Sequence, residues 1–224
     1  MAHDYNSQDI KILEGLEAVR VRPGMYIGST GPKGLHHILW EIVDNAIDEA
    51  ANGFADKVEV VLYKDGSVSV EDNGRGIPTD IHKQAGVSGV QVVFTQLHAG
   101  GKFNNENYSF SGGLHGVGAS VTNALSEWLE VEVYNKVVYK MRFHSYFDKT
   151  RKKMISGEPE APLEKTKIKT DKHGTFVRFK PDKEVFETIE FSLETIAKRL
   201  RELAFLNKGI TIKLTDLRDD EKFY

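Results

Sequence analysis

The sequence has no cysteine, no long apolar segment and no strong excess of either charge. Its 224 residues without a cysteine exclude disulfides and cysteine-ligated zinc or iron–sulfur sites. No apolar run approaches the roughly 20 residues of a membrane span, and the first residues lack the pattern of a signal peptide. A formal net charge of −3 argues against a dedicated DNA-binding module, which carries a strong basic excess. We therefore expect a soluble, cytoplasmic protein with no membrane partner.

Two common nucleotide-binding patterns are also missing. The sequence has no Gly-x-x-x-x-Gly-Lys-Ser/Thr motif, so it is not a P-loop NTPase. A dinucleotide-binding fold is disfavoured because strands and helices do not alternate regularly and the glycines follow a long polar loop. There are no internal repeats, and the length fits one domain with an appendage.

The clearest element that is present is a helix expected from Leu35 to Ala51. With about 100° per residue, its polar side chains fall on one stripe and its apolar side chains cover the remaining arc. Carboxylates and amides are costly in an apolar interior, so the stripe should face a cavity that holds water, a metal or a polar ligand. The alternative is a solvated edge of an amphipathic helix. The stripe contains His37, Glu41, Asp44, Asn45 and Asp48.

Hydrophobic periodicity and turn signals predict the other elements. Helices are expected at residues 9–19, 117–125 and 191–206, and residues 89–97 fit a short helix or a strand, of which the helix is favoured. Strands are expected at 57–63 and 67–72, joined by an Asp-Gly turn, and at 128–134, 137–143, 174–181 and 209–214. Residues 20–28 should run into an extended piece after a Pro-Gly turn, 128–134 should pair with 137–143, and 148–172 should form an irregular connection.

A glycine-rich loop lies between Ala99 and Gly118 and contains six glycines. Such a loop is typical of an active-site lid, and it leads into a predicted helix whose first backbone N–H groups would bind an anion such as phosphate. Asp72 ends a strand just before a second glycine-containing turn. Together with the polar stripe, these features predict a nucleotide site.

Four motifs carry a resemblance to a known family. The chain resembles the GHKL ATPases, and within them the B subunits of bacterial type II topoisomerases, gyrase and topoisomerase IV. The resemblance covers nearly the whole chain and implies an α+β two-layer sandwich, with a mixed, mainly antiparallel sheet and helices on one face. The motifs are Glu41-x-x-x-Asn45, Asp72-x-Gly74-x-Gly76, the run from Gly112 to Gly118, and Gly174-Thr175; the branch-specific blocks are 22–28, 43–50 and 97–103.

The resemblance implies an ATP site with Mg²⁺. Glu41 would be the general base for the attacking water, and His37, one turn earlier, would hold its carboxylate. The alternative for His37 is a core histidine bonded to the backbone. Asn45 would give its amide oxygen to Mg²⁺, and Asp72 would accept the exocyclic amine of adenine. Thr175 would reach the same edge of adenine through water.

The remaining implied contacts surround the nucleotide. Ile77 and Pro78 would line the adenine pocket, Gly76 would admit the base, and Glu49 would pair with Arg75 at the mouth. The phosphates would meet Lys102 and the backbone of Gly113, Leu114, His115, Gly116, Val117 and Gly118, and Tyr108 would lie near the ribose.

Three further expectations concern the domain boundaries, the N-terminal arm and the rim of the nucleotide pocket. Residues 1–24 would form an N-terminal arm and short helix, and 25–224 the ATPase domain, without the following domain that supplies a lysine to the γ-phosphate. Tyr5 and Ile10 would cross to a partner subunit, the alternative being a frayed terminus. Asn135 stands where the family usually has a rim arginine, which argues against strong coumarin affinity, although other ATP-competitive inhibitors would bind.

The resemblance predicts ATP-driven dimerisation of two B subunits, which closes a gate on DNA. With the A subunit in an A2B2 heterotetramer, this drives strand passage and negative supercoiling. DNA would be bound through the full complex and not tightly by this chain. The alternatives are decatenation by a topoisomerase IV, a non-hydrolysing nucleotide-gated clamp or chaperone module, and direct DNA binding by this region.

Overall fold

A mixed sheet forms the back layer of the protein. The computed structural model describes residues 15–97, 118–219 and 222–223. Within them, seven strands lie in the order β4-β3-β5-β2-β1-β6-β7, and every neighbouring pair is antiparallel except β1 with β6. The strands are β1 (Lys57–Leu62), β2 (Val68–Asp72), β3 (Ser126–Asp148), β4 (Lys153–Pro159), β5 (Glu164–Pro181), β6 (Thr211–Asp216) and β7 (Lys222–Phe223). The predicted α+β class with a mainly antiparallel sheet is confirmed.

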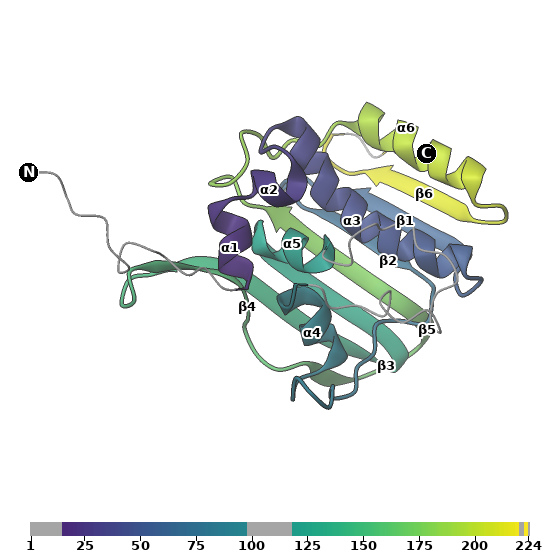
Figure 1. Cartoon of the computed structure of the whole chain (residues 1–224). Coiled ribbons are helices and arrows are strands. Elements are labelled where there is room, and N and C mark those ends of the chain that lie inside the picture. The colour runs from purple at the N-terminus through teal and green to yellow at the C-terminus, as the bar shows by residue number, and fades with distance from the viewer. Residues whose placement is uncertain (1–14, 98–117, 220–221, 224) are drawn as a thin grey trace, which may run out of the picture.

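Helices form the second layer. Figure 1 shows the first five in front of the sheet, with the last one beside β6. None of the helices in the described ranges is both long enough and apolar enough to span a membrane. They are α1 (Leu16–Val21), α2 (Gly24–Ile27), α3 (Pro32–Ala51), α4 (Gly89–Thr95), α5 (Gly118–Ala124) and α6 (Leu193–Leu206).

Helix α3 is the longest helix and lies over the middle of the sheet (Figure 1). Pro32 occupies its first turn, where the missing N–H costs nothing, so the helix begins three residues before the predicted Leu35. Most of its apolar arc is buried, including Leu35 and Val43 at 0% exposure, while Trp40 is half-buried. After Ala51 the chain leaves the helix through Gly53, which has φ 80°, a left-handed conformation that is common directly after a helix.

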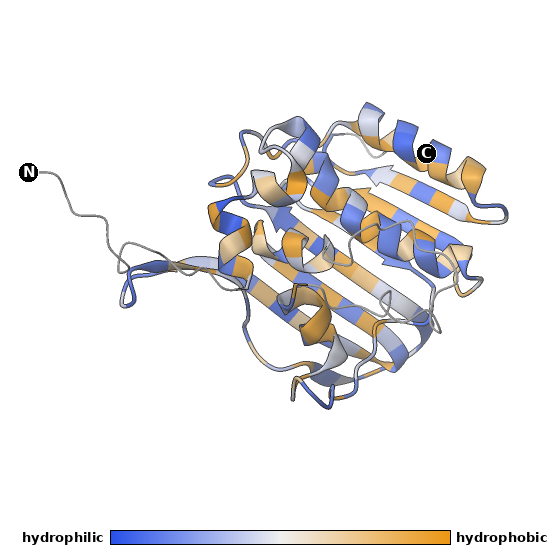
Figure 2. Cartoon of the chain, in the orientation of Figure 1, coloured by the Kyte–Doolittle hydropathy of each residue, from blue (hydrophilic) through white to orange (hydrophobic). Residues whose placement is uncertain are grey.

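The hairpin of β1 and β2 matches its prediction. Val60 lies opposite Val70, and the strands are joined by a turn in which Gly66 has φ 83°. Alternate β1 side chains are buried under the helices, a pattern that Figure 2 shows as alternating colours along the strands. This hairpin carries Asp72 to the end of β2.

The prediction of an extended piece at residues 20–28 is wrong. Helix α1 continues to Val21, and α2 occupies Gly24–Ile27. Pro23 precedes α2 with φ −59° and ψ −36°, values that suit the start of a helix as well as a turn. Burial of Ile27 at 3% exposure fixes this short helix against the core.

The predicted pairing of 128–134 with 137–143 is also wrong. Both segments belong to the single strand β3, and the apparent turn between them is an irregularity at Asn135–Val137, where Lys136 has φ 60°. The supposed irregular connection at 148–172 contains β4 and the first half of β5. Most side chains in that half of β5 are exposed, so the sequence there does not alternate between apolar and polar residues. Its backbone nevertheless pairs with β3 and makes it a strand.

Candidate functional site

The polar stripe of α3 links two groups of motif residues. Glu41, Asn45 and Glu49 follow one another at single-turn spacing, which spreads them over about 12 Å of helix. Glu41 lies against Gly118, the first residue of α5, whereas Glu49 contacts Gly74 and Arg75 after β2. One elongated site therefore runs along α3, with Asn45 between its two ends.

The loop of residues 72–78, hereafter the Asp72 loop, forms the first end. Asp72 lies opposite Thr175 of β5, and its Oδ1 accepts a hydrogen bond of 2.8 Å from the backbone N–H of Gly74. The pKa of the Asp72 carboxyl is raised to about 7, because the effect of burial and of the nearby Glu49 charge exceeds the opposing effect of the hydrogen bond from Gly74. This carboxyl is an acceptor held away from bulk water.

Two glycines allow the strands to approach the Asp72 loop closely. Gly174 has φ 118°, and a Cβ there would lie 2.0 Å from the carbonyl oxygen of Asp72. Gly76 has φ 81°, and its Cβ would lie 3.0 Å from a methyl group of Val133. A side chain at Gly174 would push β5 away from Asp72, so the close approach requires glycine.

Thr175 joins β5 to the far side of the Asp72 loop. Its hydroxyl oxygen accepts a hydrogen bond of 3.1 Å from the N–H of Ile77, and the residue is 7% exposed. A hydroxyl can accept and donate at once, so its proton is still able to reach another acceptor. Ile77 is half-buried and Pro78 is exposed, which places them at the edge of this end of the site.

The expected ion pair between Glu49 and Arg75 is present. The Arg75 guanidinium donates to both Glu49 carboxylate oxygens, at 3.2 and 2.8 Å, and the Arg75 backbone N–H donates to the same carboxylate at 2.9 Å. The guanidinium also covers the Phe54 ring, 3.6 Å from its centroid. Glu49 is only 8% exposed, so the pair closes one wall of the site.

The other end of the site contains Glu41 and His37. His37 Nε2 lies 3.0 Å from Glu41 Oε1, as expected for residues one helical turn apart. The hydrogen bond to Glu41, together with the Glu41 and Asp44 charges, raises the pKa of His37 against the opposing effect of burial. The hydrogen bond between the imidazole and the carboxylate holds the Glu41 side chain in one orientation.

Helix α5 brings the end of the glycine-rich loop to Glu41. A Cβ at Gly118 would lie 1.7 Å from Glu41 Oε2, so only glycine fits there. The buried Thr122 hydroxyl of α5 donates to the backbone oxygen of Ile38 at 2.8 Å and fixes α5 against α3. The end of the glycine-rich loop at Gly118 therefore contacts the polar stripe of α3.

The remaining stripe residues differ in their surroundings. Asp48 is 2% exposed and its backbone oxygen accepts a hydrogen bond from the Asn52 side chain, which fits a role within the fold. Asn45 is half-buried, and its amide makes no hydrogen bond with another residue that the structure describes. That this side-chain oxygen binds Mg²⁺ stays a prediction.

Comparison with known proteins agrees with this geometry. Residues 30–185 match the family model described as histidine kinase-, DNA gyrase B-, and HSP90-like ATPase. The chain belongs to this ATPase family. It is 55% identical over 223 residues to the DNA gyrase B subunit of Archaeoglobus fulgidus, an alignment that covers 99% of this chain and 34% of that protein.

Two bacterial relatives give the same result. The DNA gyrase B subunits of Thermotoga maritima and Halalkalibacterium halodurans are 53% and 56% identical over 219 and 220 residues, or 97% of this chain in each case. These alignments cover 32% and 33% of the relatives. The chain therefore spans about a third of the length of the curated relatives that it matches.

Membership of this ATPase family raises the question of whether ATP and Mg²⁺ fit the residues present. The glycines at 74, 76, 118 and 174 let the backbone approach the surrounding residues closely. Asp72, Thr175 and Asn45 offer an acceptor, a donor and an oxygen ligand. Among the described residues no three His, Asp or Glu side chains form a metal cluster. Mg²⁺ commonly uses one or two protein oxygens and the phosphates of its nucleotide, so a single Asn45 ligand is compatible with it.

Some predicted contacts cannot be placed. These residues lie outside the described ranges: Tyr5, Ile10, Lys102, Tyr108, Gly113, Leu114, His115, Gly116 and Val117. Gly118 is the one member of the predicted phosphate loop within them.

The sequence reasoning missed three residues that support the Asp72 loop. Phe54 carries the Arg75 guanidinium, Asn73 accepts hydrogen bonds of 3.0 Å from the N–H groups of Asp56 and Lys57, and His173 contacts Gly74. Asn73 lies inside the Asp72-x-Gly74 motif and was detectable there. Phe54 and His173 act through contacts between distant segments, for which the sequence has no local signal.

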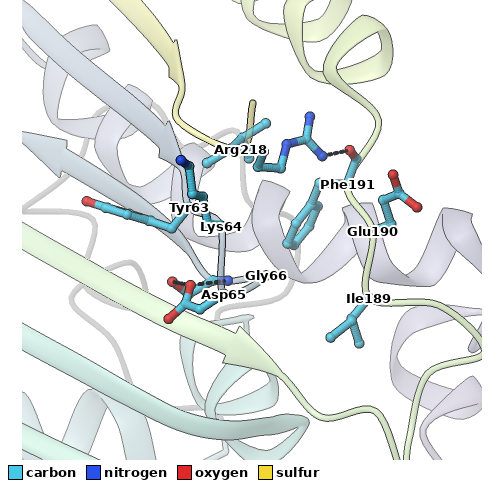
Figure 3. A pocket seen from close by; sticks show the side chains of 10 residues that line it. Tyr63, Lys64, Asp65, Gly66, Ile189, Glu190, Phe191 and Arg218 are labelled. Atoms are coloured by element: carbon cyan, nitrogen blue, oxygen red, sulfur yellow. Dashed lines mark hydrogen bonds between the residues drawn. The ribbon is translucent and has the colours of Figure 1, made fainter. Parts of the chain in front are cut away.

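A separate pocket of about 320 Å³ lies at the turn between β1 and β2, at the opposite end of β2 from Asp72 (Figure 3). Two of its charged groups form hydrogen bonds within the protein itself. Arg218 donates to Asp216 and to the backbone oxygen of Phe191, while Asp65 accepts from Ser67. We assign no ligand to this pocket.

Proposed function

We propose that this chain binds and hydrolyses ATP as the ATPase region of a type II topoisomerase B subunit. The observation that carries the proposal is the stripe of α3, which runs from the Glu41–His37 pair beside Gly118 to the Asp72 loop. The identity of more than 50% with DNA gyrase B subunits over nearly the whole chain favours gyrase over topoisomerase IV.

Adenine would bind at the Asp72 loop. The ionised Asp72 carboxylate accepts a hydrogen bond from the exocyclic amine of adenine, whereas the carbonyl at that position of guanine would repel it. Thr175 accepts from Ile77 and keeps its own proton, so it can donate to the same edge of the base directly or through water. Ile77 and Pro78 supply apolar contact to the ring.

Hydrolysis would take place beside Gly118. Glu41 takes a proton from the water that attacks the terminal phosphate, and the phosphate leaves ADP with the bond to its bridging oxygen broken. His37 is a positioning residue for this carboxylate, through the 3.0 Å hydrogen bond. Asn45 would hold Mg²⁺, which neutralises phosphate charge when it is bound.

In the full-length protein, ATP binding would bring two B subunits together and close a gate on DNA. Hydrolysis would reopen it, and the A subunit in an A2B2 complex would supply the DNA cleavage needed for strand passage and supercoiling. The N-terminal residues Tyr5 and Ile10 would contact the second B subunit. Topoisomerase IV activity is the alternative within the same family.

Two substitutions test this proposal at the two ends of the site. Asp72→Asn should abolish binding of a non-hydrolysable ATP analogue in calorimetric titration, because the amide presents a donor to the adenine amine. Glu71→Gln is the matched control, since Glu71 pairs with Lys172 at 2.9 Å and should leave binding unchanged. Retained analogue affinity in Asp72→Asn would refute the assignment of the adenine end.

The second substitution separates an ATPase from a non-hydrolysing clamp. Glu41→Gln should keep nucleotide binding and lose hydrolysis by about 10²-fold or more, measured in a protein that includes the following domain. If hydrolysis were unchanged in that variant, Glu41 would not be the general base.

A further inference from the structure

His173 contacts the Asp72 loop from β5. It lies directly before Gly174 and Thr175, and its Nδ1 is 2.9 Å from the backbone oxygen of Gly74. A carbonyl oxygen only accepts hydrogen bonds, so Nδ1 carries the proton and donates. We propose that His173 is a positioning residue that sets the nucleotide affinity of the site through this hydrogen bond, an inference that rests on the proposed ATP-binding function.

The contact fixes one particular peptide group. The Gly74 carbonyl belongs to the same peptide plane as the Arg75 N–H, which donates to Glu49 at 2.9 Å. His173 therefore holds one side of this plane and Glu49 the other, and the two hydrogen bonds polarise each other through the peptide group. The plane cannot rotate without breaking at least one of them.

The orientation of this plane matters because its neighbours form the adenine end of the site. The N–H of Gly74 donates to Asp72 at 2.8 Å, and Gly76 follows with φ 81°. Glycine gives this loop little stiffness of its own. The plane must therefore be held from outside, so that Asp72 and the backbone near Gly76 keep the spacing that a base requires.

His173 reaches the loop from a side that Glu49 and Asn73 do not. Those two residues attach the loop to α3 and to the start of β1, whereas His173 attaches it to β5. The residue is exposed, and its strand partner Asn135 is exposed as well. Replacing the imidazole should therefore change the loop without opening the hydrophobic core.

The test uses the geometry of the donor. In His173→Asn the side-chain amide places an N–H close to the former Nδ1, in His173→Gln the N–H moves one methylene further out, and in His173→Ala it is missing. Lys172→Ala is the control, because the neighbouring Lys172 pairs with Glu71 and does not touch the loop. The dissociation constant of a non-hydrolysable ATP analogue is measured by calorimetry for each variant of the chain.

We expect affinity to fall about three- to tenfold in His173→Ala and His173→Gln, as for the loss of one ordinary hydrogen bond. His173→Asn should return to within about twofold of the native value, and Lys172→Ala should not differ from it. The midpoint of thermal unfolding without nucleotide should be the same in all four variants. A residue with a general structural role would instead lower that midpoint and would not be rescued by asparagine.

A double substitution tests the shared peptide plane. His173→Ala combined with Glu49→Gln should weaken binding by less than the product of the two single effects, because each change alone already frees the same plane. Native affinity in His173→Ala, or affinity in His173→Asn no better than in His173→Ala, would overturn the inference. If either of these results is found while Asp72→Asn still abolishes binding, the inference about His173 fails and the proposed ATP-binding function stands. Failure of the inference and failure of the proposed function can therefore be distinguished.

Discussion

At the scale of single residues, Asp72 combines its proposed role in adenine binding with a cost to the stability of the fold. Its pKa of about 7 lies above the ordinary 3.8 because burial removes water from the carboxyl. At a pH between these two values, the Asp72 carboxyl is protonated in the native protein and ionised in the unfolded chain. The free energy of unfolding therefore decreases as the pH rises from about 4 to about 7 and is level above that range.

The prediction is a pH-dependent stability difference between the native protein and Asp72→Asn. The two should be equally stable near pH 4, and the variant should gain steadily up to pH 7, by at most about 4 kcal/mol. Denaturant unfolding at pH 4, 5, 6, 7 and 8 measures this difference directly. A constant difference across the series would mean that the Asp72 pKa is not raised in the free protein.

At the scale of elements, α1 depends on one buried ion pair. Six residues are too few for a helix that is stable by itself. Arg20 pairs with Asp182, at the end of β5, with both side chains only 8% exposed, and donates at 3.2 Å to the Ala124 carbonyl at the end of α5. Arg20 therefore ties α1 to the helix that begins beside Glu41.

Removing one partner of this pair should be strongly destabilising. Arg20→Met leaves the Asp182 carboxylate buried without its cation, and we expect the free energy of unfolding to fall by about 3–5 kcal/mol. Arg22→Met, at an exposed neighbouring arginine, is the control and should change it by less than about 0.5 kcal/mol. Adding Asp182→Asn to Arg20→Met should recover part of the loss, and strict additivity of the two changes would argue against a coupled pair.

The elements near the site were largely predictable because their signals are local. The one-turn spacing of His37 and Glu41, the Asp-Gly turn and the apolar arc of α3 all act within a few residues. Two of the errors arose where long-range pairing decides the structure. The exposed first half of β5 is a strand because β3 offers it backbone partners, and the irregularity after Asn135 looks like a turn in the sequence.

The same distinction applies to the site. Glu41, Asn45 and Asp72 belong to motifs, so their grouping could be expected before the structure was known. His173 and Gly74 are separated by 99 positions, and Arg20 and Asp182 by 162, so only the fold brings them together. Supporting residues of this kind have no spacing that a sequence pattern could reveal.

At the scale of the whole molecule, the charges are distributed as cross-strand pairs along the sheet. Lys213 pairs with Glu59 at 2.9 Å and Lys172 with Glu71 at 2.9 Å. The Arg178 guanidinium lies 3.7 Å from the centroid of the Tyr63 ring. Basic and acidic residues thus pair across neighbouring strands, which agrees with a formal net charge of −3. That DNA is bound only through the full complex stays a prediction.

The nucleotide site joins elements from the middle of this molecule, so its occupation should stabilise the whole domain. A ligand that binds only the native state at 100 times its dissociation constant adds about 2.7 kcal/mol. For a domain of this size, that amount raises the midpoint of thermal unfolding by roughly 5–11 °C. We expect this shift with a non-hydrolysable ATP analogue and Mg²⁺, measured by calorimetric or fluorescence-detected melting. The matching GTP analogue should give no shift, because Asp72 repels the guanine carbonyl, and equal shifts with the two nucleotides would contradict base recognition by Asp72.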